Sequence, residues 1–307
     1  MASVLEGLAA ARPGLRVDFW SKREHVGLLS GKDYLGDFHG LEGPLVPSLL
    51  HENTWENATL PDFLTRADGV LIFGQSGTRI LAERLTARLK GRADWVRSFP
   101  TGDEPIIHAS DFVRKQLIRL GWQVPGQTPR VIPPEEETAA SEDLLAYFGV
   151  SAPPVLIHPG SGGKKKVWPL RNWQALIHWM RCAGRIPVLL SIGPADEGGD
   201  DFAQAMQGEG VRVVRGLSIL RLAALISLCR CYLGSDSGVS HLAAAVGVPA
   251  VVVFGPTNPA VWAPRGKDVR IVRRNWSESD VFDWRPGPPG PPDAGLVEVV
   301  SGIGCGL

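Results

Sequence analysis

Eight consecutive residues combine hydroxyls, a carboxylate and two glycines in one short stretch, Gly234-Ser235-Asp236-Ser237-Gly238-Val239-Ser240-His241. Apolar runs at 231–233 and 250–254 flank it, and Leu242-Ala243-Ala244-Ala245 continues it, which predicts strand, tight turn, helix and strand. Backbone N–H groups in the first turn of a helix lack intrahelical partners, and the helix dipole favours an anion there. The stretch therefore predicts a phosphate-sized site. Its candidate residues are Asp236, Ser237, Gly238 and His241.

Two other interpretations of this turn stay open. Asp236 can cap the helix while His241 is satisfied inside the core, which would make both residues structural. A metal site is disfavoured, because Asp236 and His241 are five residues apart and do not share one face of a helix.

A second glycine-rich loop lies between a strand that ends at His158 and a helix that begins after Pro169. Glycines let the backbone approach a ligand closely, and the lysines of 164–166 supply charge for a diphosphate. The loop has neither the Gly-Lys-Ser/Thr of a phosphate-binding P-loop nor the third glycine of a dinucleotide loop. A solvated lysine run is the alternative. The candidate binding residues here are Gly160, Ser161, Gly162 and Lys166.

Two further strand ends carry polar loops, Gly193-Pro194-Ala195-Asp196-Glu197 and Phe254-Gly255-Pro256-Thr257-Asn258-Pro259. A carboxylate in the first of them, Asp196, could accept hydrogen bonds from ribose hydroxyls. In open α/β sheets, ligands bind beyond the carboxyl ends of the strands. Because four consecutive strand ends carry such loops, the sequence predicts a nucleotide-diphosphate pocket in the second half of the chain.

The order of apolar runs predicts an α/β protein with two domains. Strands and helices alternate clearly from residue 155 onward, which indicates a mostly parallel sheet covered on both faces. The first half follows the same order less regularly, and the proline-rich segment 125–134 reads as a linker. We place the domain boundary near Gly149, giving domains 1–149 and 150–307, the second with a Pro/Gly-rich surface loop at 285–292.

Composition excludes some classes of protein. The 307 residues carry a formal net charge of zero, which disfavours nucleic acid as the main partner. The start of the sequence lacks the basic and apolar regions of a signal peptide, and no apolar run approaches the length of a membrane span. These features predict a cytoplasmic protein without a transmembrane segment.

The four loops, in this order, resemble glycosyltransferase family 9, the heptosyltransferases of bacterial lipopolysaccharide synthesis. The resemblance is specific from about Val155 to Pro264, diffuse before that and slight beyond Arg274. It implies the GT-B arrangement, in which two Rossmann-like domains face each other across a cleft. It further implies transfer of a heptose from an ADP-sugar to a lipid-linked saccharide acceptor at the inner membrane surface, with inversion and with neither a required metal nor a cofactor. A peripheral location at that membrane would follow.

The resemblance also assigns roles. Ser161 and Gly162 would hold the diphosphate, Asp196 or Glu197 would meet the ribose, and Lys166 would neutralise the departing ADP. Asp236, Ser237, Gly238 and His241 would surround the diphosphate and the sugar. Gly160 is a further expected nucleotide-sugar-binding residue, and Lys166 and Asp236 are the residues expected to take part in catalysis.

One departure from the family's pattern concerns the first domain. Members begin with a strand and a Gly-Asp loop whose Asp is the presumed base, whereas Met1 falls inside what would be the following helix. The absence of that central strand would leave two unpaired strand edges. Asp18, Asp33 and Asp37 are candidate replacement acids, with no spacing that chooses among them. A nucleotide-sugar-binding protein without turnover and a glycosyltransferase with a different sugar donor therefore remain alternatives, whereas a dinucleotide-dependent oxidoreductase is disfavoured.

Overall fold

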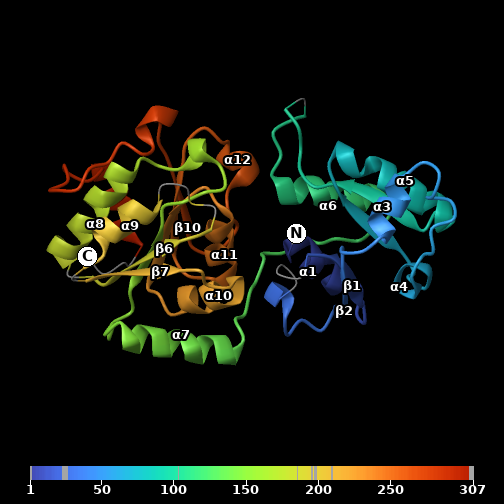
Figure 1. Cartoon of the computed structure of the whole chain (residues 1–307), viewed down its shortest axis with the longest axis horizontal. Coiled ribbons are helices and arrows are strands. Elements are labelled where there is room, and N and C mark those ends of the chain that lie inside the picture. Colours follow the sequence, from blue (N-terminus) through green and yellow to red (C-terminus); the bar gives the residue numbers. More distant parts are fainter. Residues whose placement is uncertain are drawn as a thin grey trace. The chain divides into compact units, whose positions relative to one another are not determined.

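The structure is a computed structural model that describes residues 2–22, 27–102, 104–184, 186–194, 196, 199–208 and 210–303. The chain forms two compact units, Met1–Gln127 and Thr128–Leu307 (Figure 1). Both are built from parallel strands and helices, so the expected α/β class is confirmed.

The second unit contains one parallel sheet whose strands lie in the order β10-β9-β8-β5-β6-β7. Two strands that are distant in sequence, β5 and β8, are therefore neighbours, with Val155 opposite Cys231. The strand order reverses between them, which makes this the switch point where doubly wound folds bind ligands. The strands are β5 (Val155–His158), β6 (Val188–Ile192), β7 (Val211–Arg215), β8 (Cys231–Ser235), β9 (Ala250–Phe254) and β10 (Val269–Arg273).

Helices cover both faces of this sheet, as Figure 1 shows for α8 and α9 on one side and α10 and α11 on the other. Helix α8 has one apolar face, because Trp173, Leu176, Ile177 and Met180 recur at helical spacing and are all buried in the core against β5 and β6. The helices are α7 (Glu135–Tyr147), α8 (Leu170–Gly184), α9 (Gly199–Met206), α10 (Ile219–Ser227), α11 (Gly238–Val246), α12 (Pro259–Trp262) and α13 (Ala294–Gly302).

The first unit has four strands in two separate parallel pairs, β1–β2 and β3–β4. Among the described residues no ladder joins the pairs, which agrees with the two unpaired edges expected from the sequence. The strands are β1 (Val17–Ser21), β2 (Leu35–Gly40), β3 (Val70–Gly74) and β4 (Ala93–Arg97). The helices are α1 (Ala2–Ala11), α3 (Leu45–Leu50), α4 (Asp62–Thr65), α5 (Arg79–Arg88) and α6 (Ala109–Arg119).

Helix α1 packs against both strand pairs. Its Leu5 shares an apolar cluster with Val17 of β1, and its Leu8 shares another with Leu71 of β3. Even so, no residue of β1 or β3 is buried, whereas every residue of β5 and β8 is. Among the described residues, β1 and β3 have a strand neighbour on one side only, whereas β5 and β8 have one on each side.

The junction between the units differs from the expected boundary near Gly149. Helix α7 packs on α10, its Ser141 is fully buried, and its Glu137 forms an ion pair with Arg221 of α10. These contacts place α7 in the second unit, so the chain passes from the first unit to the second between Gln127 and Thr128.

Candidate functional site

The loops that follow β5 and β8 are tied together at the switch point. Ser235 Oγ donates to the Pro159 carbonyl (2.7 Å) and accepts from the Trp168 backbone N–H (3.3 Å). Ser161 Oγ in turn donates to the Asp236 carbonyl (2.7 Å). Because Ser161, Ser235 and Asp236 are all buried, water competes little for these bonds. The structure thus brings the two predicted loops together and orders both.

The loop after β6 joins the same group through Asp196. Its buried carboxylate accepts a hydrogen bond from the Gly193 backbone N–H, with Oδ2 2.5 Å from the nitrogen. A Cβ on residue 160 would overlap this carboxylate, so only glycine fits there. The Asp196 carboxylate therefore packs directly against the loop after β5. Glu197, the other candidate for the ribose, lies outside the described residues.

Lys166 lies at the end of a 3₁₀ turn, Lys164–Lys166, with its Nζ 3.2 Å from Asp236 Oδ2. The same carboxylate oxygen accepts a hydrogen bond of 2.6 Å from the Thr257 hydroxyl. The neighbouring Lys165 instead pairs with Glu278 at the surface, Nζ to Oε2, at 3.5 Å. Lys166 is thus directed to the loop after β8, whereas a run of lysines that served only for solvation would not need such a contact.

The Ser237 hydroxyl at the amino end of α11 does not cap the helix. Ser237 occupies the N-cap position but makes no side-chain capping bond. Its Oγ is buried and makes no hydrogen bond of acceptable geometry among the described residues. The Tyr232 hydroxyl, which lies near enough to interact with it, forms its hydrogen bond with Ser240 Oγ (3.0 Å). Since a buried hydroxyl without a partner is costly, this atom and the first N–H groups of α11 together favour an anionic ligand.

Gly238 and His241 both lie at the exposed side of this turn. Gly238 is the first residue of α11, and a Cβ there would meet nothing within 4 Å. His241 is exposed, not buried in the core as the structural interpretation requires, and Asp236 is not the cap. Gly162 is exposed on the facing loop.

His158 closes the floor of the site at the end of β5. It is buried, and its Nδ1 lies 3.1 Å from the Ser191 carbonyl and 3.9 Å from Asp196 Oδ2. Burial lowers the pKa of His158 below its usual value, and the Asp196 carboxylate only partly opposes this. The ring is therefore neutral at neutral pH.

A pocket opens beside the glycine loop. Gly160, Ser161 and Asp196 form polar parts of its lining, and Leu170, Ile192 and Phe282 form apolar parts. A mixed lining of this kind suits a ligand with both a charged and a flat apolar portion. Within the described residues, no group of three or more His, Cys, Asp or Glu side chains is placed to hold a metal ion.

The sequence did not single out Thr257, Ser235 or Phe282 as site residues. Thr257 and Ser235 lie inside the predicted loops, so the sequence placed their hydroxyls near the site but did not indicate their hydrogen-bond partners. Phe282 is 86 residues further along than Asp196, and only folding brings it to the pocket.

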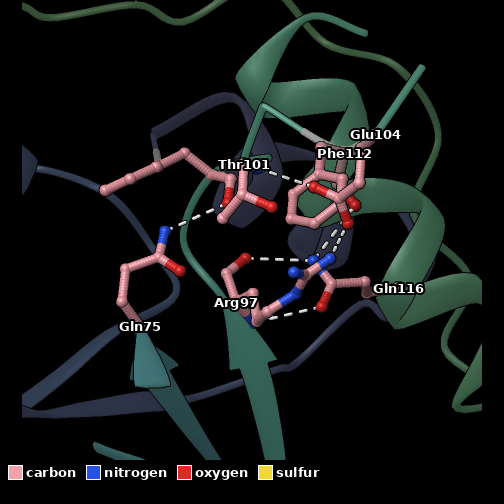
Figure 2. Close-up of polar contacts among 7 residues, drawn as sticks. Gln75, Arg97, Thr101, Glu104, Phe112 and Gln116 are labelled. Atoms are coloured by element: carbon pink, nitrogen blue, oxygen red, sulfur yellow. Dashed lines mark hydrogen bonds and ion pairs between the residues drawn. The ribbon is translucent and has the colours of Figure 1, made fainter. Parts of the chain in front are cut away.

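The first unit contributes a different polar cluster where β4 ends (Figure 2). Arg97 pairs with Glu104, its guanidinium lies 4.9 Å from the centre of the Phe112 ring, and its backbone exchanges two hydrogen bonds of 3.0 Å with the Gln116 amide. Gln75, just past β3, donates to the Phe99 carbonyl (3.0 Å). These contacts hold the end of β4 against α6.

The candidate replacement acids lie elsewhere. Asp18 lies in the first half of β1, Asp37 lies in the first half of β2, and Asp33 precedes β2. Asp18 and Asp37 both form ion pairs with Arg16. None of the three is at the carboxyl end of a strand, where a ligand of this fold binds.

The sequence profile of glycosyltransferase family 9 (heptosyltransferase) matches residues 106–283, more than half of the chain. The chain belongs to this family. Among curated family relatives, it is 33% identical over 125 residues to lipopolysaccharide heptosyltransferase 1 of Pseudomonas aeruginosa. The matched segment covers 41% of this chain and 35% of that protein. It is 28% identical over 167 residues to lipopolysaccharide heptosyltransferase 2 of Salmonella typhimurium, covering 52% and 47%. The chain thus matches a third to a half of the length of these relatives.

Solved structures in the family resemble the whole chain. The ADP-heptose lipopolysaccharide heptosyltransferase II of Escherichia coli has a TM-score of 0.71 at 19% identity, covering 98% of this chain and 93% of that one. The Escherichia coli heptosyltransferase WaaC with ADP has a TM-score of 0.65 at 16% identity, covering 98% and 94%. At such identities the likeness establishes the GT-B-like fold. In the described part of the chain, no helix combines the length and apolar character needed to cross a bilayer.

Proposed function

We propose that this chain is an inverting glycosyltransferase that takes a heptose-like sugar from an ADP-sugar and transfers it to an acceptor of the lipopolysaccharide-core type. Family membership supports the reaction class, and the names of the relatives support the sugar and the acceptor. The ADP named with one structural neighbour supports the nucleotide. A lipid-linked acceptor would be met at the inner membrane surface.

One observation carries the donor part of the proposal. The Lys166 ammonium, the buried unpartnered hydroxyl of Ser237 and the open amino end of α11 converge at the switch point of the second sheet. Each of these groups favours negative charge, and a sugar donor presents its pyrophosphate as two adjacent anions. We assign the pyrophosphate to this place, with the remaining predicted site residues around it.

The same groups supply what the reaction needs. As the bond from the sugar to the pyrophosphate breaks, negative charge grows on the departing ADP while the sugar gains oxocarbenium character. Lys166 and the α11 amino end would stabilise that charge in the transition state. A fixed ammonium and a helix amino end supply the positive charge that a bound cation supplies in other enzymes, so we propose a metal-independent reaction.

A nucleotide-sugar-binding protein without turnover is the second candidate. It is favoured by the position of Asp18, Asp33 and Asp37, which all lie away from the carboxyl ends of the first unit's strands. The two candidates share the donor site and differ only in turnover, so release of ADP from an ADP-heptose in the presence of acceptor separates them.

The lysine run offers a matched pair of variants for the donor site. Lys166→Ala should weaken ADP binding by roughly 1–3 kcal/mol, the usual effect of losing a charge-assisted bond. Lys165→Ala removes an equal charge one residue away, from a side chain paired with Glu278, and should leave the affinity nearly unchanged. Isothermal titration with ADP measures both. Equal losses, or no loss in Lys166→Ala, would remove Lys166 from the site.

A further inference from the structure

Thr257 is linked to the proposed diphosphate site through one carboxylate oxygen. Its hydroxyl donates to Asp236 Oδ2 over 2.6 Å, and the same oxygen lies 3.2 Å from Lys166 Nζ. The three side chains come from loops after three different strands, β9, β8 and β5. Thr257 is therefore two contacts away from the place assigned to the pyrophosphate.

The backbone of Asp236 is already fixed without Thr257. Its N–H donates to the Val253 carbonyl (3.2 Å), and its own carbonyl accepts from Ser161 Oγ (2.7 Å). Rotation of the carboxylate about the side-chain bonds is the freedom that remains. Since the Asp236 side chain is only 5% exposed, water has little access to replace the Thr257 hydroxyl.

The hydroxyl of Thr257 has no competing role in the next helix. Asn258 caps α12, because its side chain accepts from the Ala260 backbone N–H (3.0 Å). Threonine is also stiff about its first side-chain bond, so it presents the hydroxyl in a defined direction. Both facts indicate that the Thr257 hydroxyl orients the Asp236 carboxylate.

We propose that Thr257 is a positioning residue which, by orienting the Asp236 carboxylate, holds the Lys166 ammonium ready for the diphosphate. Lys166 has a long side chain that is 37% exposed, and such a side chain samples many rotamers unless a partner holds it. Preorganising it lowers the cost of binding. The inference rests on the proposed function, because it presumes a diphosphate ligand.

Thr257→Val tests the inference, since valine has nearly the same shape and lacks the donor. Titration calorimetry with ADP and with inorganic pyrophosphate should show the affinity for both ligands falling by the same factor, about tenfold, as for loss of a hydrogen bond to a charged group. Thr257→Ser keeps the donor and should recover most of the affinity. In a Lys166→Ala background, Thr257→Val should cause no further loss, because the residue acts through that lysine.

Two results would overturn the inference while leaving the proposed function intact. One is a folded Thr257→Val protein that binds ADP and pyrophosphate as the unchanged protein does. The other is a loss that adds in full to that of Lys166→Ala. If the unchanged protein binds neither ligand, the inference and the proposed function fail together. Should Thr257→Val not fold, Thr257→Ala removes the same donor and takes its place in the cycle, and a loss that adds in full to that of Lys166→Ala refutes the role.

Discussion

At the scale of single residues, most polar side chains of the site have hydrogen-bond or ion-pair partners, and one buried hydroxyl does not. Ser161, Ser235 and Asp236 each have a defined partner across the loops after β5 and β8. Ser237 has none in the described structure. Natural proteins rarely leave a buried hydroxyl in that state without a reason, and a ligand oxygen is the partner that its surroundings favour.

Two glycines of the site differ in the space that a Cβ would find, which leads to a prediction for each of them. A Cβ at 160 would overlap the Asp196 carboxylate, whereas a Cβ at 238 meets nothing within 4 Å. Gly160→Ala should therefore lower the free energy of unfolding by about 1–3 kcal/mol, the range for overpacking a filled space. Gly238→Ala should leave stability unchanged or slightly raised, yet weaken ADP binding by crowding the ligand at the α11 amino end.

Urea unfolding and titration with ADP measure the two effects on each variant. A Gly238→Ala protein that binds ADP normally would show that no ligand approaches this end of α11 closely. A Gly160→Ala protein of unchanged stability would show that the Asp196 carboxylate moves aside at little cost.

At the scale of elements, the two units differ in how completely their strands are paired. In the second unit, β5 has a partner on each side, β6 and β8, and all its residues are buried. In the first unit, β1 and β3 each pair with one strand only among the described residues. Two-stranded sheets are marginally stable by themselves, so the first unit depends on its helices, among them α1, which contacts both pairs.

Hydrogen exchange should reveal this difference in pairing. Backbone amides of β1 and β3 are expected to exchange much faster than those of β5 and β8, because an open edge allows local opening at a low free-energy cost. Peptide-resolved exchange followed by mass spectrometry measures both sets in one sample, with β9 as a fully buried internal reference. Protection of β1 and β3 equal to that of β9 would mean that their edges are covered in solution.

At the scale of the whole molecule, the proposed donor site lies within Thr128–Leu307 alone. A ligand that binds one folded unit stabilises that unit by mass action, by about 2.7 kcal/mol at a hundredfold excess over its Kd. For a unit of this size the stabilisation corresponds to a rise in midpoint of roughly 5–10 °C.

ADP should therefore raise the thermal midpoint of the second unit while leaving that of the first nearly unchanged. Mass-spectrometric detection of peptides from each unit along the heating curve measures both midpoints, so the first unit serves as the control. A shift confined to Met1–Gln127, or none in either unit at millimolar ADP, would contradict the donor assignment.

Much of the second unit could be predicted because its local patterns and its tertiary environment agree. The strands at 155–158 and 250–254 are short apolar runs, and their predicted bounds coincide with β5 and β9. Strand β2, Leu-Gly-Asp-Phe-His-Gly, was missed because its glycines and aspartate oppose strand formation locally, and only pairing with β1 decides it. For α7 the sequence predicts a helix only over Asp143–Phe148, because residues 135–142 carry few apolar side chains that would mark a helical face.

The sequence by itself determined the α/β class, the family and the loops that bear the site, because glycines, hydroxyls and apolar runs act locally and keep their spacing along the chain. Only the tertiary structure decided that α7 belongs with the second unit, that Lys166 rather than Lys165 meets Asp236, and that Thr257 and Phe282 stand at the site. Those pairings join residues far apart in sequence, and only the order of strands in the sheet brings them within contact.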